Sequence, residues 1–239
     1  MDDLTPRVLY VDERIVAVDK PVGIAAIPER DLAVPSVQRA LEAARGERLW
    51  VVHRLDKEVS GLLVFARTAE AHRHLSLAFE RRQVDKAYLA LLVGLAAGDP
   101  GQTFTIAHPI HEFGSGRMGV DPRGKPSTTH WQALAHAAAD SSSERVGAGH
   151  TLVLARPATG RRHQLRVHFY AVGHPIAGDP RYGDHAAQAA YPRLMLHARS
   201  LVLPMPDRPP LALSAPPDAA FLAVLRAHGI AADALGPEP

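Results

Sequence analysis

The stretch HRLDKEVSGLLVF, residues 53–65, carries the pattern on which the fold prediction rests. Apolar runs at 49–55 and 61–66 stand on either side of its polar residues, and Gly61 begins the second run. This alternation is typical of two strands joined by a polar turn. The turn would hold a His, an Arg and an Asp at the end of a strand, where a rigid scaffold often presents functional side chains. A plain hairpin with a charged tip fits the same pattern equally well.

Outside this hairpin, the chain mixes predicted strands and helices without a regular strand–helix–strand repeat. Ser36 and Thr68 are potential N-caps of helices that continue to Arg45 and to about Gln83. The mixed order favours an α+β fold over a parallel sheet. Further strands are predicted at 8–17, with a polar turn at 12–14, and at 86–94, 129–134, 151–155 and 195–204, and further helices at 161–172 and 218–228.

The length of 239 residues fits one large domain or two small ones. The linker-like stretch 135–149 lies between two predicted strands, so we interpret it as a long hairpin loop and not as a domain boundary. We therefore expect a single domain over 1–239, with a core at about 8–215, a helix at 218–228 and a tail at 229–239.

The composition excludes several classes of protein. The chain contains no cysteine, which excludes disulfides, thiolate zinc sites, iron–sulfur clusters and cysteine nucleophiles. No apolar stretch approaches 18 residues, so no membrane-spanning helix is predicted. The acidic start Met1-Asp2-Asp3 does not resemble a signal peptide. We expect a cytoplasmic protein.

The charge balance is close to neutral, with 27 Lys and Arg against 25 Asp and Glu, a formal net charge of +2. Lysine occurs only at positions 20, 57, 86 and 125, and all other basic residues are arginine. Arginine presents a flat fork of donors that suits phosphates and base edges. An arginine-rich chain can equally reflect a GC-rich genome, so both interpretations stay open.

Two patterns that imitate ligand sites do not carry one. The GSGRMG sequence at 114–119 matches a dinucleotide-binding pattern, but Pro122 and Pro126 follow it where a helix would have to begin. We interpret this segment as a loop. The close histidine pairs 72/74 and 108/111 lack a third ligand at a suitable spacing, so we expect no metal site.

The block TGRRHQLRVH, residues 159–168, is rich in arginine. If it is helical, Arg162 and Arg166 lie one turn apart. Such a face could hold a cation beside a carboxylate or bind phosphates near the helix start. A solvated arginine stripe is the simpler alternative. In the segment DKAYLALLVG, Tyr88 lies on a predicted strand and would by itself be a core or edge tyrosine.

Taken together, these blocks resemble the RluA family of RNA pseudouridine synthases. The resemblance runs in consistent order over about residues 8–215. The motifs that carry it are VLYVDERIVAVDKPVG near the start, HRLDKEVSGLLVFA at 53–66, DKAYLALLVG at 85–94, GKPSTT at 124–129, TGRRHQLRVHFYAVGHPIAGDPRYG at 159–183 and LMLHARSLVLPMP at 194–206.

The resemblance implies an enzyme that isomerises specific uridines to pseudouridine in a stem-loop of tRNA, rRNA or both. The bond from ribose C1′ to N1 breaks, the uracil rotates, and C5 joins C1′. No cofactor and no metal would be needed. The implied fold is one catalytic domain with a bent, mostly antiparallel sheet, flanked by helices and crossed by an RNA-binding cleft. The target base would have to be flipped out of its stack.

The family pattern also assigns roles to residues. Asp56 matches the essential carboxylate, Tyr88 the tyrosine that packs on the target base, and Arg166 the basic residue paired with that Asp. A guanidinium beside a carboxylate in a closed pocket stabilises its ionised form. A phenol offers a flat stacking face and a polar oxygen. Arg54 matches the arginine that enters the RNA stack as the uridine leaves. We also expect His53, Arg161 and Arg162 to contact RNA and Leu196 to line the uracil pocket.

The sequence departs from the family pattern at two positions. The family usually has Thr at the position of Val59, and Thr or Ser at the position of Arg162. The family region begins near residue 8 and leaves no room for an S4-type RNA-binding domain, so we expect a stand-alone domain that acts as a monomer. A non-catalytic RNA-binding or remodelling protein on the same fold is the alternative. A hydrolase that uses Asp56 and Glu58 is disfavoured because two residues in one tight turn give no clear acid and base.

Overall fold

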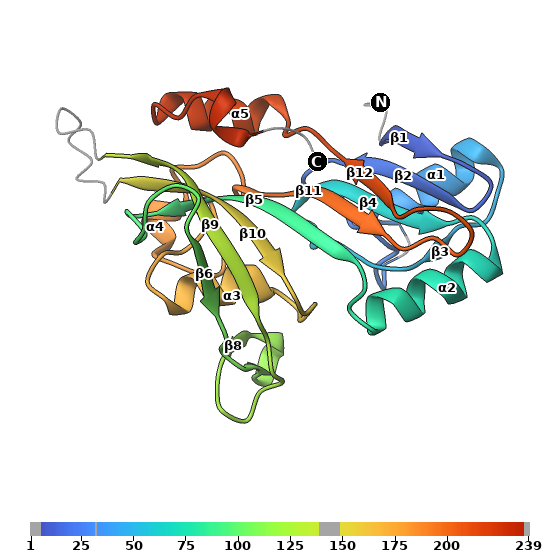
Figure 1. Ribbon diagram of the computed structural model, residues 1–239, viewed down its shortest axis with the longest axis horizontal. Coiled ribbons are helices and arrows are strands. Elements are labelled where there is room, and N and C mark those ends of the chain that lie inside the picture. The colour runs from blue at the N-terminus through green and yellow to red at the C-terminus, as the bar shows by residue number, and fades with distance from the viewer. Residues whose placement is uncertain (1–5, 32, 139–148, 237–239) are drawn as a thin grey trace. The chain divides into compact units, whose positions relative to one another are not determined.

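The computed structural model describes residues 6–31, 33–138 and 149–236, and Figure 1 shows the path of the chain. These residues form two compact units. The first contains residues of the ranges 6–86 and 197–217, and the second contains residues of 87–196 and 218–236. Each unit thus combines segments that are far apart in the sequence. The expectation of a single domain stays a prediction.

The first unit is built on a sheet of short strands. Neighbouring strands are antiparallel, with one exception: β4 and β11 are parallel, with His197 opposite Ser60. In Figure 1 the orange strands β11 and β12 lie beside the blue and cyan strands of the chain's start. The order is β1 (Arg7–Val11), β2 (Ile15–Lys20), β4 (Ser60–Ala66), β11 (Leu196–Leu203) and β12 (Leu211–Ser214), and β3 (Trp50–Val51) also pairs with β4.

The parallel pair explains the glycine that follows the polar turn. Gly61 has a φ of +105°, and a Cβ at this position would lie 2.2 Å from the carbonyl oxygen of Ala198. Any side chain would therefore collide with the backbone of β11. Gly61 allows β4 to begin immediately after the turn and to pair with β11 at once.

Two helices accompany this sheet. Helix α1 (Val37–Arg45) begins after Ser36, whose hydroxyl accepts from the Arg39 amide, and α2 (Ala69–Glu80) begins after Thr68. Both predicted caps are confirmed, but α2 ends before Gln83. Its end is set by Arg82, whose positive φ of 60° is incompatible with a helix. The core of the unit consists of Ile15, Ala17, Leu62, Val64, Leu75, Ala78, Val84, Leu201, Leu203, Leu213 and Ala215.

The second unit contains an antiparallel sheet and a separate hairpin. The sheet has the order β5 (Asp85–Val93), β10 (His150–Pro157), β9 (Thr129–Ala137) and β6 (Thr103–Ile106). The hairpin pairs β7 (Ile110–Glu112) with β8 (Met118–Val120). The helices are α3 (Gln164–Ala171), α4 (His185–Gln188) and α5 (Ala219–Ala227), and 3-10 turns lie at Gly114–Gly116 and Ala232–Leu235.

Several sequence predictions change in detail in this unit. The GSGRMG segment forms a 3-10 turn followed by strand β8 and not the start of a helix, as its prolines indicated. The predicted helix at 161–172 begins only at Gln164, because His163 has a φ of +54°. The predicted tail contains a short 3-10 helix at Ala232–Leu235. The predicted loop at 135–149 begins too early, because strand β9 continues to Ala137. Residues 139–148 of this loop, as well as residues 237–239, lie outside the described residues.

The predicted α+β class and the mostly antiparallel pairing are confirmed. The sequence missed the short strands β6, β7, β8 and β12, each of only three or four residues. Runs this short carry little periodicity, so no local pattern distinguishes them from loops. Among the described residues, no helix combines the length and apolarity needed to cross a membrane.

Candidate active site

The turn that carries Asp56 connects β3 to β4 and is held by backbone contacts. The Val59 amide donates to the Asp56 carbonyl at 3.1 Å, which closes the turn. The carbonyl of the next residue, Lys57, accepts from the Gly23 amide at 2.9 Å. Leu55 is buried, whereas Arg54 is exposed and Asp56 is half-buried. The turn is therefore anchored by its backbone and by Leu55, and it leaves Arg54 accessible to solvent.

A fully buried lysine strengthens this anchor. The Nζ of Lys20 donates to the carbonyls of Pro21 at 2.8 Å, Ile24 at 2.7 Å and Lys57 at 3.1 Å. An ammonium has three protons to donate, and a buried one is costly unless its donors are satisfied. Lys20 thus ties the segment that follows β2 to the turn that carries Asp56.

His53 continues the ladder of β4 where strand β3 has ended. Its Nε2 accepts from the Val64 amide at 3.0 Å, and its ring stacks on Phe79 with 4.8 Å between centroids. Burial, with a further contribution from the charge of Lys86, lowers the pKa of His53 from 6.5 to about 3. The ring is therefore neutral and acts as an acceptor within the first unit. Its expected contact with RNA stays a prediction.

This environment predicts a pH-dependent stability. Between about pH 6.5 and pH 3, the unfolded chain binds a proton at His53 that the folded chain does not. The free energy of unfolding therefore decreases as the pH falls through this window, by at most about 1.4 kcal/mol per pH unit from this residue. We expect His53→Gln, which keeps an acceptor but does not titrate, to show a shallower decrease in urea unfolding between pH 7 and pH 4. Equal slopes for the two proteins would contradict this account.

A second histidine fixes the start of β4. His197 is fully buried; its Nε2 lies 3.0 Å from the Ala215 carbonyl oxygen and its Nδ1 lies 2.8 Å from the Ser60 hydroxyl. Because a carbonyl can only accept, Nε2 carries the proton and Nδ1 accepts from Ser60. The hydrogen bonds connect β4, β11 and the residue after β12. They stiffen the strand that directly follows the Asp56 turn.

In the second unit, a buried glutamine fixes the start of helix α3. The Oε1 of Gln164 accepts from the Thr159 hydroxyl at 2.6 Å and from the Arg161 amide at 3.1 Å. Its Nε2 donates to the Thr128 carbonyl at 2.9 Å and to the Thr129 hydroxyl at 3.1 Å. All donors and acceptors of this amide are used, so the helix is held firmly against the end of β9.

One turn later, His168 continues the same network. Its Nδ1 lies 2.9 Å from the Thr129 hydroxyl, and its Nε2 lies 3.0 Å from the His108 carbonyl oxygen. Burial lowers the pKa of His168, which favours the neutral ring. Arg166 stands between Gln164 and His168 on the helix, so its backbone is fixed from both sides.

The Arg166 guanidinium makes two parallel bonds to a buried carboxylate. Its Nε and Nη2 each lie 2.7 Å from an oxygen of Asp179, and both side chains are almost completely buried. The Tyr182 ring lies beside the guanidinium at 5.3 Å. Burial raises the pKa of Tyr182, so its hydroxyl keeps its proton, and this hydroxyl forms a hydrogen bond with Nδ1 of His163 at 2.9 Å. These contacts leave Arg166 with one defined position.

The sequence alone did not indicate Asp179 as a site residue, although it lies in the GDPRYG part of the motif at 159–183. One of its carboxylate oxygens also accepts from the Arg181 amide at 2.9 Å and the Tyr182 amide at 3.2 Å. An Asp that binds amides two and three residues ahead is a common turn feature, and Asp-Pro is a local signal for it. That signal predicts the turn and not the arginine that the carboxylate binds.

The other predicted residues of the second unit have different surroundings. Tyr88 is half-buried on β5, opposite Ala155 of β10. Leu196 is buried. Arg162 is exposed and binds Glu112 at 3.1 Å. Arg161 is half-buried, and its Nε has no hydrogen-bond partner among the described residues.

The structure thus brings together Arg54 and Asp56, next to His53, on one anchored turn of the first unit. The remaining predicted residues are Tyr88, Arg161, Arg162, Arg166 and Leu196, and they belong to the second unit. The expected pairing of Arg166 with Asp56 stays a prediction. Within the described residues, no group of three or more His, Asp and Glu side chains is arranged to hold a metal ion.

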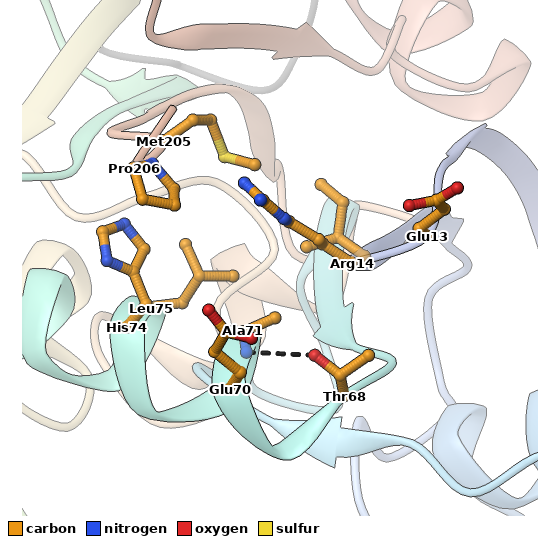
Figure 2. Close-up of a pocket in the computed structure, with 10 residues that line it drawn as sticks. Glu13, Arg14, Thr68, Glu70, Ala71, His74, Leu75, Met205 and Pro206 are labelled. Atoms are coloured by element: carbon orange, nitrogen blue, oxygen red, sulfur yellow. Dashed lines mark hydrogen bonds between the residues drawn. The ribbon is translucent and has the colours of Figure 1, made fainter. Parts of the chain in front are cut away.

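A hollow of about 280 Å³ in the first unit does not involve any of these residues. It lies between the β1–β2 turn, helix α2 and the residues after β11, and Figure 2 shows Arg14 and His74 on its opposite sides. Its lining residues are Glu13, Arg14, Ile15, Thr68, Glu70, Ala71, His74, Leu75, Met205 and Pro206.

Comparison with known proteins gives one consistent result. A family model described as RNA pseudouridylate synthase matches residues 14–171. The chain is 37% identical, over 92% of its length and 98% of the relative, to an uncharacterized RNA pseudouridine synthase of Zymomonas mobilis. It is 36% identical, over 83% of its length and 86% of the relative, to the dual-specificity RNA pseudouridine synthase RluA of Haemophilus ducreyi.

A solved structure agrees with this comparison. The human RNA pseudouridylate synthase domain containing 1 protein is similar over 100% of this chain and 98% of its own. The TM-score is 0.74 and the sequence identity is 28%. The similarity therefore extends over the whole chain and covers both units.

Proposed function

The chain belongs to the RNA pseudouridylate synthase family, and from that membership we propose that it isomerises specific uridines to pseudouridine in a stem-loop of tRNA, rRNA or both. The observation that carries this proposal is the range of the family match. Residues 14–171 include Asp56, Tyr88 and Arg166. We further propose that it acts as a monomer in the cytoplasm.

In this reaction the C1′–N1 bond breaks, the uracil rotates and a C1′–C5 bond forms. N1 gains a proton and C5 loses one, so the product is an isomer of the substrate. Asp56 is the essential carboxylate of the exchange. Its turn is fixed by the Val59 amide and, through Lys57, by the ammonium of Lys20. A carboxylate on a fixed turn needs little reorganisation when the substrate arrives.

Tyr88 packs on the uracil and takes the proton that leaves C5. Its phenol ring supplies a flat face on which a base can stack. Arg166 provides positive charge for the carboxylate of the reaction. Its two bonds to Asp179 orient the guanidinium before RNA binds. Leu196 lines the apolar side of the uracil pocket, in keeping with its burial.

The remaining residues act on the RNA backbone and stack. The target uridine has to leave its stack, which costs a few kcal/mol. Arg54 is exposed beside the Asp56 turn, and its guanidinium fills the vacated place. His53 holds the start of this turn to β4 through its bond with the Val64 amide, and it contacts RNA at the edge of the turn. Arg161 and Arg162 precede helix α3 and bind phosphates.

The proposal is tested by mapping pseudouridine at nucleotide resolution across the RNA of the source strain. The native strain is compared with a deletion strain and with a strain that carries Asp56→Asn. We expect one or a few sites to disappear in both altered strains, which would identify the substrate. If the purified protein bound RNA but left all of its uridines unchanged, the non-catalytic alternative would replace this proposal.

A further inference from the structure

The hairpin of β7 and β8 is joined to the start of helix α3 by an exposed ion pair. Nη1 of Arg162 lies 3.1 Å from Oε1 of Glu112, the last residue of β7. Their side chains are 41% and 58% exposed. A Cβ at Gly116, in the bend of the hairpin, would lie 3.2 Å from the same Nη1. The guanidinium therefore rests against the bend, with the Glu112 carboxylate beside it.

The hairpin is also attached to the helix by an apolar contact. Ile110 of β7 and Met118 of β8 pack with Val167 of α3 and with Tyr182. Tyr182 in turn lies against the Arg166 guanidinium. This contact keeps the hairpin in place without the ion pair, so the Glu112 carboxylate can leave Arg162 without releasing the hairpin.

The charges around the pair favour an anion. The other acid of this hairpin region, Asp121, already accepts hydrogen bonds from both Nε and Nη2 of Arg123 at 2.9 Å. Arg117 and Lys125 are exposed, and Nε of Arg161 is buried without a hydrogen-bond partner among the described residues. In this region the cationic side chains therefore outnumber the acidic ones, and the Glu112 carboxylate is one of the few acids among them.

We propose that Glu112 occupies Arg162 as a stand-in for an RNA phosphate and that a phosphate of the correct substrate displaces it. This inference rests on the proposed function and adds a regulatory element to the same RNA site. An RNA that fits the site delivers a phosphate to Arg162, whereas an RNA that does not fit leaves the Glu112 carboxylate on Arg162 and gains no contact with that guanidinium. Glu112 therefore lowers non-specific binding and makes the site more selective.

The exchange is energetically feasible. An exposed Arg–carboxylate pair contributes little to stability, because water screens both charges. A phosphate can accept two parallel hydrogen bonds from the same guanidinium, and the release of counterions from RNA makes the free energy of binding more favourable. The weak intramolecular pair can therefore be replaced by a stronger intermolecular one.

The test measures RNA binding at several salt concentrations by fluorescence anisotropy. The probes are a labelled RNA stem-loop with uridines in its loop and labelled polyadenylate as the non-specific RNA. We expect Arg162→Gln to reduce the slope of log K against log salt by about 0.7–0.9 for the stem-loop, the value for one lost phosphate contact. We expect Glu112→Gln to strengthen binding by about two- to fivefold, and polyadenylate to gain more than the stem-loop.

The double variant separates this mechanism from simple removal of a negative charge. If Glu112 acts through Arg162, Glu112→Gln has no effect on binding once Arg162→Gln is present. An equal gain in both backgrounds, or an unchanged salt slope in Arg162→Gln, would overturn the proposal. A protein that shows the expected coupling but isomerises no RNA would instead refute the proposed function alone.

Asp99→Asn is a matched control because it removes one exposed negative charge elsewhere on the second unit. Asp99 follows Gly98, whose carbonyl is bound by His136 of β9. Thr129, at the other end of β9, is bound by Gln164 of α3. The two ends are about 23 Å apart at 3.3 Å per residue. We expect Asp99→Asn to bind both RNAs as the wild type does.

Discussion

Replacement of Asp56 by Asn will lower the rate of pseudouridine formation by about 10³-fold or more while RNA binding persists. The exchange removes the charge and the basicity of the carboxylate but keeps its size, and a positioned acid or base alone contributes about 10²–10⁴-fold. The bond from the Val59 amide goes to the Asp56 backbone carbonyl, so the turn should form as before. Tritium release from RNA labelled at C5 of uridine measures the rate.

Glu58→Gln is the matched control for this prediction, because Glu58 belongs to the same turn and carries the same charge. A mechanism with one essential carboxylate predicts a loss of less than about tenfold for this variant. A loss as large as that of Asp56→Asn would show that the reaction needs a second carboxylate, Glu58, and would contradict the assignment of one essential carboxylate. Turnover near the wild-type rate in Asp56→Asn would remove Asp56 from its assigned role.

Replacement of Asp179 by Asn will have the largest effect on stability. Both oxygens of this carboxylate bind the Arg166 guanidinium, and both side chains are almost completely buried. Breaking a buried ion pair by removing the charge of one partner typically costs about 3–5 kcal/mol. We expect a decrease of this size in the free energy of unfolding in urea, together with a loss of activity because Arg166 is no longer oriented.

The chain offers a control with the same chemistry in a different environment. Asp121 also binds an arginine through both oxygens, at 2.9 Å from Nε and Nη2 of Arg123, but the Arg123 side chain is 71% exposed. We expect Asp121→Asn to change the free energy of unfolding by about 0–1 kcal/mol. Equal costs for the two variants would show that burial does not determine the contribution of the Arg166–Asp179 pair.

Local sequence was sufficient to predict the elements that depend on near neighbours. The apolar run at 61–66 predicts strand β4, and the starts of α1 and α2 follow from Ser36 and Thr68. These features depend on interactions over three or four residues, so the chain specifies them without its tertiary structure. The strand predicted at 49–55 is wrong in length, because only Trp50–Val51 forms a strand. The family resemblance then indicated candidate residues for the reaction, because its motifs extend over most of the chain.

Interactions between distant segments required the folded chain. The parallel pairing of β4 with β11, which explains Gly61, joins residues 137 positions apart. Asp179 as the partner of Arg166 was likewise absent from the sequence analysis.

The sequence by itself determined the family, the α+β class and the local turns and caps, because each is written in short-range patterns or in motifs that can be read one after another. The tertiary structure decided which charged side chains form ion pairs with one another. Arg162 could have been a solvated arginine, but Glu112, 50 positions earlier, lies beside it. The reason is that electrostatic partners depend on distance in space and burial, and neither is fixed until the strands have paired and the core has excluded water.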